Sequence, residues 1–126
     1  MSDRDDLVIL TVDDDFINLK LIKSILLKTK RVKEVIEAKD GNEAVDILKS
    51  REDIDLVLLD IIMPIMNGIE VLQVVRADNN LKQLPIIVLT TDETRKSQAM
   101  ENGANGFITK PVKSEELLRQ VYGMID

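Results

Sequence analysis

Short apolar runs that alternate with longer segments of helical periodicity are the feature that most constrains the fold of this chain. The runs Leu7–Val12 and Leu56–Leu59 contain no charged residue. A strand that is apolar at successive positions is usually buried on both faces, which is typical of a parallel sheet covered by helices on both sides. The alternation of such strands with helices therefore predicts an α/β domain with right-handed crossover connections.

Five strands and five helices are expected along the chain. The strands are expected at Leu7–Val12, Glu34–Ala38, Asp55–Asp60, Pro85–Leu89 and Gly106–Thr109. The helices are expected at Phe16–Thr29, from a cap at Asp40, from Asn67 to about Asp78, at Asp92–Asn102, and from a cap at Ser114 through Met124. A chain of 126 residues is long enough for one core and too short for two, so residues 1–126 are expected to form one domain.

Composition and charge exclude several classes of function. With 23 acidic and 17 basic residues, the formal charge is −6, which disfavours direct binding to nucleic acid or an anionic membrane. The absence of cysteine excludes disulfides, and the absence of histidine removes the commonest general base. The polar segment Met1–Asp6 is unlike a signal peptide, and no apolar stretch approaches the ~20 residues that span a bilayer, so we expect a soluble, cytoplasmic protein.

Polar side chains follow four of the expected strands, at the point where each strand ends. They are Asp13, Asp14, Asp15, Asp60, Thr90, Thr91 and Lys110. In a parallel sheet these ends share one edge, and ligands bind there. Carboxylates at the ends of neighbouring strands repel one another by ~4 kcal/mol per pair at an effective dielectric of 20, unless a cation lies between them. Mg²⁺ suits one or two carboxylates together with phosphate oxygens, so the sequence predicts a magnesium-dependent phosphoryl site. Asp15 taken alone is better explained as the N-cap of the helix that follows it.

Four motifs together resemble the receiver domain of bacterial two-component response regulators. They are Val12–Asp15, Leu58–Gly68, Val88–Thr91 and Gly106–Pro111. The resemblance covers essentially the whole chain, and single-domain chemotaxis members of that family have the same length. It implies a flavodoxin-like receiver fold, with a five-stranded parallel sheet in the order 2-1-3-4-5 and helices on both faces.

The resemblance also implies a role for each residue of the site. Asp60 would be the phosphoacceptor, while Lys110 and Thr90 would contact other phosphoryl oxygens. The Mg²⁺ ligands would be Asp13, Asp14, Asp60 and the backbone carbonyl of Ile62. The Lys110–Pro111 peptide bond is expected to be cis. The donor would be a phosphohistidine on a histidine kinase or a histidine phosphotransfer protein, and since the chain has no histidine, that donor must be another molecule.

Thr90 and Phe107 are the switch residues that the resemblance implies, although Phe107 alone would be read as core packing. Phosphorylation would draw the Thr90 hydroxyl toward the phosphoryl group and let the ring of Phe107 turn into the space that it leaves. This would shift a pre-existing equilibrium between two conformations. The face of Asp92–Asn102, Gly106–Thr109 and Ser114–Met124 would then bind a target protein or a second copy, so the chain would be a monomer or a phosphorylation-dependent dimer. In the last helix, the residues expected to pack on the sheet are Leu118, Val121 and Ile125, with Leu117, Tyr122 and Met124 extending the apolar arc.

Three positions depart from the usual family pattern. Thr91 stands where a small residue is common, Ile62 stands where some relatives carry an amide, and Asp92 is acidic. These positions tune the phosphoryl lifetime in the family, so the rates of phosphorylation and dephosphorylation are the properties that we expect to differ.

Other classes of function fit the sequence less well. A phosphatase or phosphomutase would carry a second aspartate where Ile62 stands, and a flavodoxin-like nucleotide binder would carry a glycine-rich loop in place of Asp13–Asp15. A phosphorelay intermediate, a constitutive binding module, or a receiver excised from a larger hybrid kinase or regulator stays open as an alternative. The chain is not expected to be an enzyme beyond catalysing its own Mg²⁺-dependent phosphorylation and dephosphorylation.

Overall fold

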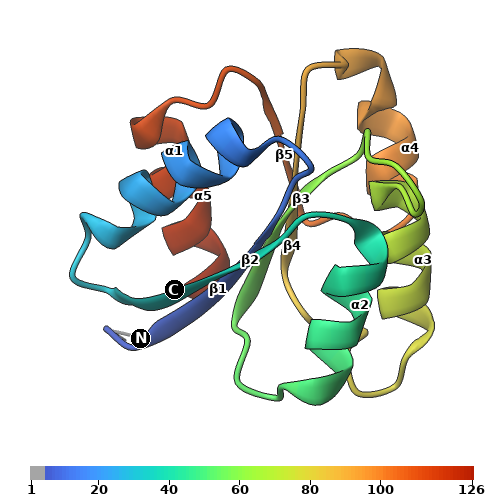
Figure 1. Ribbon diagram of the computed structural model, residues 1–126, viewed down its shortest axis with the longest axis horizontal. Helices are drawn as coiled ribbons and strands as arrows, with labels where there is room; N and C mark the ends of the chain where they lie inside the picture. Colours follow the sequence, from blue (N-terminus) through green and yellow to red (C-terminus); the bar gives the residue numbers. More distant parts are fainter. Residues whose placement is uncertain (1–4) are drawn as a thin grey trace.

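The computed structural model describes residues 5–126, which form a parallel sheet with helices on both faces (Figure 1). The strands are β1 (Leu7–Val12), β2 (Val32–Ala38), β3 (Leu56–Asp60), β4 (Ile86–Thr90) and β5 (Gly106–Thr109). The helices are α1 (Phe16–Leu27), α2 (Gly41–Ser50), α3 (Gly68–Ala77), α4 (Lys96–Glu101) and α5 (Ser114–Ile125), with a 3₁₀ turn, η1 (Glu93–Arg95), before α4. The expectation that the polar segment Met1–Asp6 is not a signal peptide falls partly on Met1–Arg4, which lie outside the described residues.

The strand order is β2-β1-β3-β4-β5, which confirms the order expected from the sequence. Val12 lies opposite both Ala38 and Leu59, so β1 and β3 end side by side. Thr90 lies opposite Thr109, so β4 and β5 also end together. This register brings the residues that follow the four strands to one edge of the sheet.

The core has two layers, one on each face of the sheet. Every residue of β1, β3 and β4 is buried, which explains why these strands are apolar at successive positions. Helices α1 and α5 cover one face, and α2, α3 and α4 cover the other (Figure 1). Among residues 5–126, no helix combines the length and the apolar character needed to cross a bilayer.

Several element boundaries differ from those expected. Helix α1 ends at Leu27 rather than Thr29, and β2 begins at Val32, two residues earlier than expected, because Val32 pairs with Leu7. Three other residues lie just outside the elements to which they were assigned. Asp55 precedes β3 and accepts a hydrogen bond from the amide of Val8, and Asp78 is the C-cap of α3. Pro85 precedes β4, which extends to Thr90.

The segment expected as one helix over Asp92–Asn102 is divided. The Asp92 side chain accepts a hydrogen bond from the amide of Thr94 and starts η1, and the α-helix proper covers only Lys96–Glu101. Ala99 is its one buried residue, so few apolar contacts extend the helix. This makes α4 the most weakly packed helix of the described chain.

The expectations for the last helix are wrong in two details. Ser114 is the first residue of α5 rather than its cap, since the N-cap is Lys113, whose side chain makes no capping hydrogen bond. Leu117 is fully buried with Val121, whereas Leu118 is only partly buried. A spacing of four residues, from Leu117 to Val121, and one of three, from Leu118 to Val121, both fit the helical period. Only the packing of α5 on the sheet selects Leu117 as the buried residue.

Arg76 of α3 ties together two loops at the amino ends of β4 and β5. Its guanidinium donates to the carbonyl oxygen of Gly103 at 2.9 and 2.7 Å and to that of Leu84 at 2.8 Å. It also donates to the carbonyl of Lys82 and to the side-chain oxygen of Asn105. A Cβ atom at Gly103, whose φ is 103°, would lie 2.8 Å from the Arg76 side chain, so glycine is required there.

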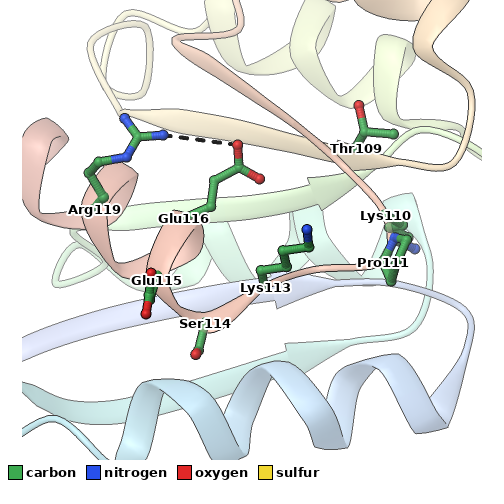
Figure 2. Close-up of a pocket in the computed structure, with 8 residues that line it drawn as sticks. All are labelled: Thr109, Lys110, Pro111, Lys113, Ser114, Glu115, Glu116 and Arg119. Atoms are coloured by element: carbon green, nitrogen blue, oxygen red, sulfur yellow. Dashed lines mark ion pairs between the residues drawn. The ribbon is translucent and has the colours of Figure 1, made fainter.

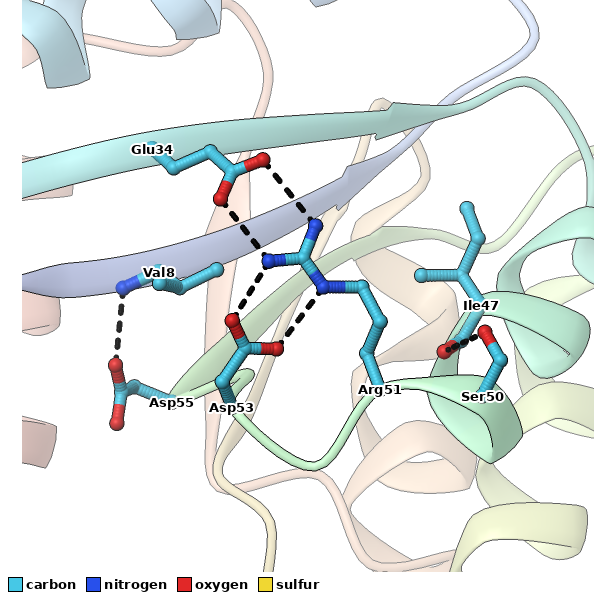
Figure 3. Close-up of polar contacts among 7 residues, drawn as sticks. All are labelled: Val8, Glu34, Ile47, Ser50, Arg51, Asp53 and Asp55. Atoms are coloured by element: carbon cyan, nitrogen blue, oxygen red, sulfur yellow. Dashed lines mark hydrogen bonds and ion pairs between the residues drawn. The ribbon is translucent and has the colours of Figure 1, made fainter.

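A second arginine links β2 to the segment between α2 and β3 (Figure 3). Arg51 donates to Asp53 at 2.9 and 2.6 Å and to Glu34 at 3.2 and 3.0 Å. These hydrogen bonds hold the pKa of both carboxyl groups below their ordinary values. The cluster lies at the end of the sheet opposite the aspartates.

Gly68, the first residue of α3, packs against the backbone of Asp60. A Cβ atom there would lie 2.3 Å from the Asp60 carbonyl oxygen and 2.8 Å from the Ile61 Cα. We expect Gly68→Ala to lower the free energy of unfolding by about 1–3 kcal/mol, because backbone must move to admit the methyl group. Urea unfolding measures this. Gly123→Ala is the control, since no atom lies within 4 Å of its added Cβ and an alanine favours the helix; an equal loss in both variants would contradict the prediction.

Candidate functional site

Three aspartates meet where β1 and β3 end. Ligand oxygens of Asp13, Asp14 and Asp60 all lie within 4.8 Å of one another. Asp13 and Asp60 are buried, with 5% and 6% of their surface exposed, whereas Asp14 is exposed. The structure thus brings together the three carboxylates that the sequence assigned to one site, and we call them the carboxylate cluster.

Lys110 brings a positive charge to this cluster from the end of β5. Its Nζ lies 2.7 Å from Oδ2 of Asp13 and 3.3 Å from Oδ2 of Asp60. The Lys110–Pro111 peptide bond is cis, as expected from the resemblance. Since the cluster holds three carboxylates and one ammonium, negative charge remains uncompensated among these four side chains, and the site favours a further cation.

Burial makes ionisation of Asp60 unfavourable. It raises the pKa of Asp60 to about 6 from the ordinary 3.8, with Lys110 opposing the rise and Asp13 adding to it. Burial alone would lower the pKa of Lys110, but hydrogen bonding to Asp13 and the charge of Asp60 outweigh it and raise that pKa. The lysine therefore stays protonated, while Asp60 is a carboxylate whose charge is held at a cost in free energy.

Asp15 has a structural task, as expected. Its side chain caps α1 by accepting a hydrogen bond from the amide of Ile17 at 2.9 Å, and its own amide donates to Oδ1 of Asp13 at 2.9 Å. Both oxygens of Asp13 are therefore engaged, one by this amide and the other by Lys110. These contacts fix the orientation of Asp13 at the edge of the cluster.

The two residues expected to switch lie on neighbouring strands. Thr90 is fully buried at the end of β4, and its hydroxyl oxygen accepts from the amide of Asp92 at 3.3 Å. Phe107 on β5 is partly buried against the core layer under α2, α3 and α4. It also borders a cavity of about 430 Å³, lined in addition by Glu93, Lys96, Thr109 and Glu116.

The positions expected to tune the reaction differ in their surroundings. Thr91 is exposed, and Asp92 caps η1 through its hydrogen bonds to Thr94, which hold the pKa of Asp92 below its ordinary value. Asp92 also pairs with Arg95 at 3.5 Å. Asp92 is thus committed to the 3₁₀ turn, while Thr91 has an open side chain beside the end of β4.

The loop between β3 and α3 contains a feature that the sequence did not reveal. Ile65 has a φ of 70°, and the amide of Met66 donates to the carbonyl of Pro64 at 2.8 Å. A hydrogen bond that spans three residues around a positive φ is the classic γ-turn, which is rare and strained. A β-branched residue in this conformation costs about 1–3 kcal/mol, and sequence rules would expect glycine or asparagine there.

A cavity of about 880 Å³ lies beside the cluster, between β5 and the start of α5 (Figure 2). It is lined by Thr109, Lys110, Pro111, Lys113, Ser114, Glu115, Glu116 and Arg119. Lys110 is the only residue that this lining shares with the four charged side chains of the site. The cavity therefore adjoins the carboxylate cluster without containing it.

Comparison with known proteins identifies the family. Residues 9–122 match the response regulator receiver domain. A chemotaxis protein CheY homolog of Campylobacter jejuni is 35% identical over 111 residues, which are 86% of this chain and 85% of that protein. The rice two-component response regulator ORR7 (Oryza sativa subsp. japonica) is 29% identical over 113 residues, 88% of this chain, and this chain spans about half of it, 53%.

Solved structures agree with this assignment. The chemotaxis response regulator CheY4 of Vibrio cholerae has a TM-score of 0.85 at 30% identity, and the match covers 94% of this chain and 98% of that one. The receiver domain of the sensor histidine kinase PA1611 from Pseudomonas aeruginosa, solved with a magnesium ion coordinated in its active site cleft, has a TM-score of 0.86 at 28% identity, covering 94% and 97%. The chain belongs to the response regulator receiver domain family and stands close to the single-domain CheY homologues of bacterial two-component systems.

Proposed function

We propose that this protein accepts a phosphoryl group on Asp60 from a phosphohistidine of another protein, and that phosphorylation changes its protein-binding surface. The observation that carries the proposal is the buried, costly charge of Asp60 beside Lys110 at the end of β3. Residues 1–126 would act as one receiver domain. Because the proposed donors are cytoplasmic signalling proteins, the proposed location is the cytoplasm.

The proposed reaction is a nucleophilic displacement at phosphorus. A carboxylate oxygen of Asp60 forms the new P–O bond, the P–N bond of the phosphohistidine breaks, and the electron pair goes to the imidazole nitrogen, which takes up a proton. The product is a mixed anhydride of the aspartyl side chain. Lys110 is already 3.3 Å from the Asp60 carboxylate, so its ammonium is placed to neutralise a phosphoryl oxygen, and the Thr90 hydroxyl would serve another.

The carboxylate cluster fits a magnesium ion. Carboxylate oxygens are the ligands that this hard cation prefers, and the magnesium-bound receiver of PA1611 shares the fold. We propose that Asp13, Asp14, Asp60 and the backbone carbonyl of Ile62 hold it. When bound, the ion supplies positive charge that stabilises the oxygens of the transferred phosphoryl group. Hydrolysis of the anhydride at the same site would end the signal, so the only reactions proposed for the chain are its own phosphorylation and dephosphorylation.

The proposed output passes through Thr90 and Phe107. The hydroxyl of Thr90 would move toward the phosphoryl group, and the Phe107 ring would turn into the space that it leaves. Phe107 already borders a cavity that includes residues of η1, α4 and α5, so its rotation would alter that surface. We propose that the face of α4, β5 and α5, within Asp92–Met124, binds the downstream protein or a second copy of the chain.

Acetyl phosphate with Mg²⁺ should add one phosphoryl group to the protein, at Asp60. Intact mass spectrometry measures the gain. Asp60→Asn should show no gain, because it removes the nucleophile. Asp15→Asn is the matched control, since it makes the same change at a residue that caps α1, and it should still be phosphorylated. Labelling of Asp60→Asn would place the nucleophile elsewhere.

Magnesium should stabilise the fold by relieving repulsion within the carboxylate cluster. At ten times the dissociation constant, binding to the folded state contributes about 1.4 kcal/mol, which raises the melting temperature by a few degrees. Thermal melts with and without MgCl₂ measure the shift. Asp14→Asn should lose most of it and Asp15→Asn should keep it; a melt of the unaltered protein that ignores magnesium would refute the site.

The raised pKa of Asp60 predicts a particular dependence of stability on pH. Because the folded state binds this proton more tightly than the unfolded state, ionisation of Asp60 destabilises the fold as the pH rises from about 4 through about 6. Without magnesium, Asp60→Asn should therefore melt above the unaltered protein at neutral pH, and the gap should close toward about pH 4. A gap of constant size would show that ionisation of Asp60 is not its cause.

Thr91→Ala should speed phosphorylation from acetyl phosphate, dephosphorylation, or both. Thr91 is exposed beside the end of β4, and the substitution removes a methyl and a hydroxyl group from the proposed approach to Asp60. Because the chain has no tryptophan whose fluorescence could follow the reaction, both rates are measured by mass spectrometry over time. Equal rates in the two proteins would show that Thr91 does not limit access.

A further inference from the structure

We propose that a cluster of basic side chains where α1 leads into β2 binds an acidic segment of a partner protein, and that the side chain of Asp126 occupies part of this surface in the free protein. The cluster consists of Lys28, Lys30, Arg31 and Lys33, which we call the basic corner. It lies at the amino ends of β1 and β2, away from the carboxylate cluster, so it is a second interaction surface that is separate from the phosphoryl site.

The basic corner belongs to a basic stretch in an otherwise acidic chain. Phe16–Lys33 contains six basic residues and no acidic one, although acidic residues outnumber basic ones by 23 to 17 in the whole chain. A run of like charge is often only a solvated surface, and Lys28 is at the C-cap of α1, where the helix dipole favours a positive charge. Lys30 and Lys33 lie beyond the helix, so the dipole does not explain their charges.

The three lysines of the basic corner are exposed and lack ion pairs within residues 5–126. Lys28, Lys30 and Lys33 all lie on the surface. The ion pairs found in this part of the chain involve other cations. Several positive charges without a paired carboxylate repel one another and attract anions, so this surface favours a negatively charged partner.

Arg31 shows which chemistry the basic corner recognises. Its guanidinium donates hydrogen bonds of 2.9 and 2.6 Å to the two side-chain oxygens of Asp126, and it lies over the Tyr122 ring, 4.7 Å from the ring centroid. The Tyr122 hydroxyl donates to the hydroxyl oxygen of Thr29 at 2.7 Å, which fixes the ring. The hydrogen bonds from Arg31 hold the pKa of the Asp126 carboxyl below its ordinary value. Two parallel hydrogen bonds are the geometry with which arginine binds a carboxylate.

A carboxylate of a partner can replace that of Asp126. The side chains of Arg31 and Asp126 are 24% and 40% exposed, and an ion pair in contact with water contributes little to stability. Asp126 directly follows α5, and the carboxyl end of the chain lies close to the segment between α1 and β2 (Figure 1). An acidic segment that places one carboxylate on Arg31 and others on the lysines therefore competes with Asp126.

The size of the basic corner selects a short acidic protein segment over other polyanions. Its four positive groups lie within six residues, and an extended peptide, which advances about 3.3 Å per residue, matches them with a few carboxylates. A long nucleic acid or an anionic membrane would also meet the acidic remainder of the chain, which repels it. The group that Arg31 already binds is itself a protein carboxylate.

A partner bound at the basic corner leaves the phosphoryl site accessible. Leu7 pairs with Val32 beside the basic corner, whereas Val12 ends β1 beside the carboxylate cluster. The five residues between them separate the two regions by about 17 Å along the strand. No residue of the basic corner belongs to the face of α4, β5 and α5. An acidic partner can therefore hold the protein while the phosphoryl site and that face remain exposed.

The probe for this surface is a hexaglutamate peptide with blocked ends, titrated into the isotope-labelled protein while amide chemical shifts are recorded. At a salt concentration of about 25 mM, we expect the largest shifts in residues 28–33 and at Asp126. Binding should weaken at about 200 mM salt, because exposed charges are then screened.

Lys30→Gln and Lys33→Gln should each weaken binding of the peptide about two- to fivefold, which is the effect of losing one exposed ion pair. The control is Lys82→Gln, which removes the same charge from an exposed side chain in the loop before β4. Its affinity should stay within about 1.5-fold of that of the unaltered protein, because the charge lies outside the basic corner.

Asp126→Asn should tighten binding about two- to fivefold, because it removes the carboxylate that competes for Arg31. Asp46→Asn is its matched control. Asp46 is an exposed residue of α2, on the other face of the sheet, so the substitution makes the same change in net charge and leaves the contact between Arg31 and Asp126 intact.

Three results would overturn the inference. The absence of peptide-dependent shifts in residues 28–33 would show that the basic corner is only a solvated surface. Equal affinities of Asp126→Asn and Asp46→Asn would show that Asp126 does not occupy the binding surface. A thymidine hexanucleotide or phosphatidylglycerol vesicles that bind as tightly as hexaglutamate would show a general attraction for anions instead of recognition of an acidic protein segment.

Discussion

Repulsion among carboxylates at one edge of the sheet is the constraint around which this molecule is organised. Parallel pairing of β1 and β3 places Asp13 and Asp60 next to each other, and two like charges at such spacing cost ~4 kcal/mol at an effective dielectric of 20. The sheet must continue to β5 to bring Lys110 to these charges. The burial that raises the pKa of Asp60 makes its negative charge costly, so one arrangement both destabilises the fold and favours a further cation beside these carboxylates.

The framework around this site is rigid on one side and loosely packed on the other. Gly68 and Gly41 allow the close contacts that hold the β3–α3 loop, since a Cβ atom at Gly41 would lie 2.5 Å from the carbonyl oxygen of Met66. The loop is thus supported by both α2 and α3. Beyond β4, in contrast, a 3₁₀ turn and a short helix have Ala99 as their only buried residue. Local stability follows buried apolar contacts, so η1 and α4 are the segment of the described chain where a rearrangement costs least.

Most of the fold could be predicted from the sequence because its signals are local. Uninterrupted apolar runs mark doubly buried strands, and Asp40 and Asn67 cap their helices as their spacing indicates. The division of η1 from α4 and the burial of Leu117 rather than Leu118 could not be predicted, because the helical period allows either solution and packing on the sheet decides.

The carboxylate cluster was also predictable, since strand ends meet in any parallel sheet, and the same reasoning placed Lys110 at that edge. Its hydrogen bond to Asp13, 97 positions away in the chain, was not predicted. The φ of Ile65 depends on anchors at both ends of its loop, which no local rule contains.

The contacts of Arg76 have a consequence for the geometry of any movement in α4. Its hydrogen bonds to Gly103, together with the contact of Gln73 with Asn102, fix the carboxyl end of that helix to α3. The opposite end joins η1, which is held mainly by the Asp92 cap. Helix α4 is therefore held at its carboxyl end, and we expect it to rotate about Gly103. A movement of the other end of α4, beside Thr90, would then tilt the helix rather than shift it toward or away from the sheet. A partner bound to the face of α4, β5 and α5 would meet the helix at a different angle.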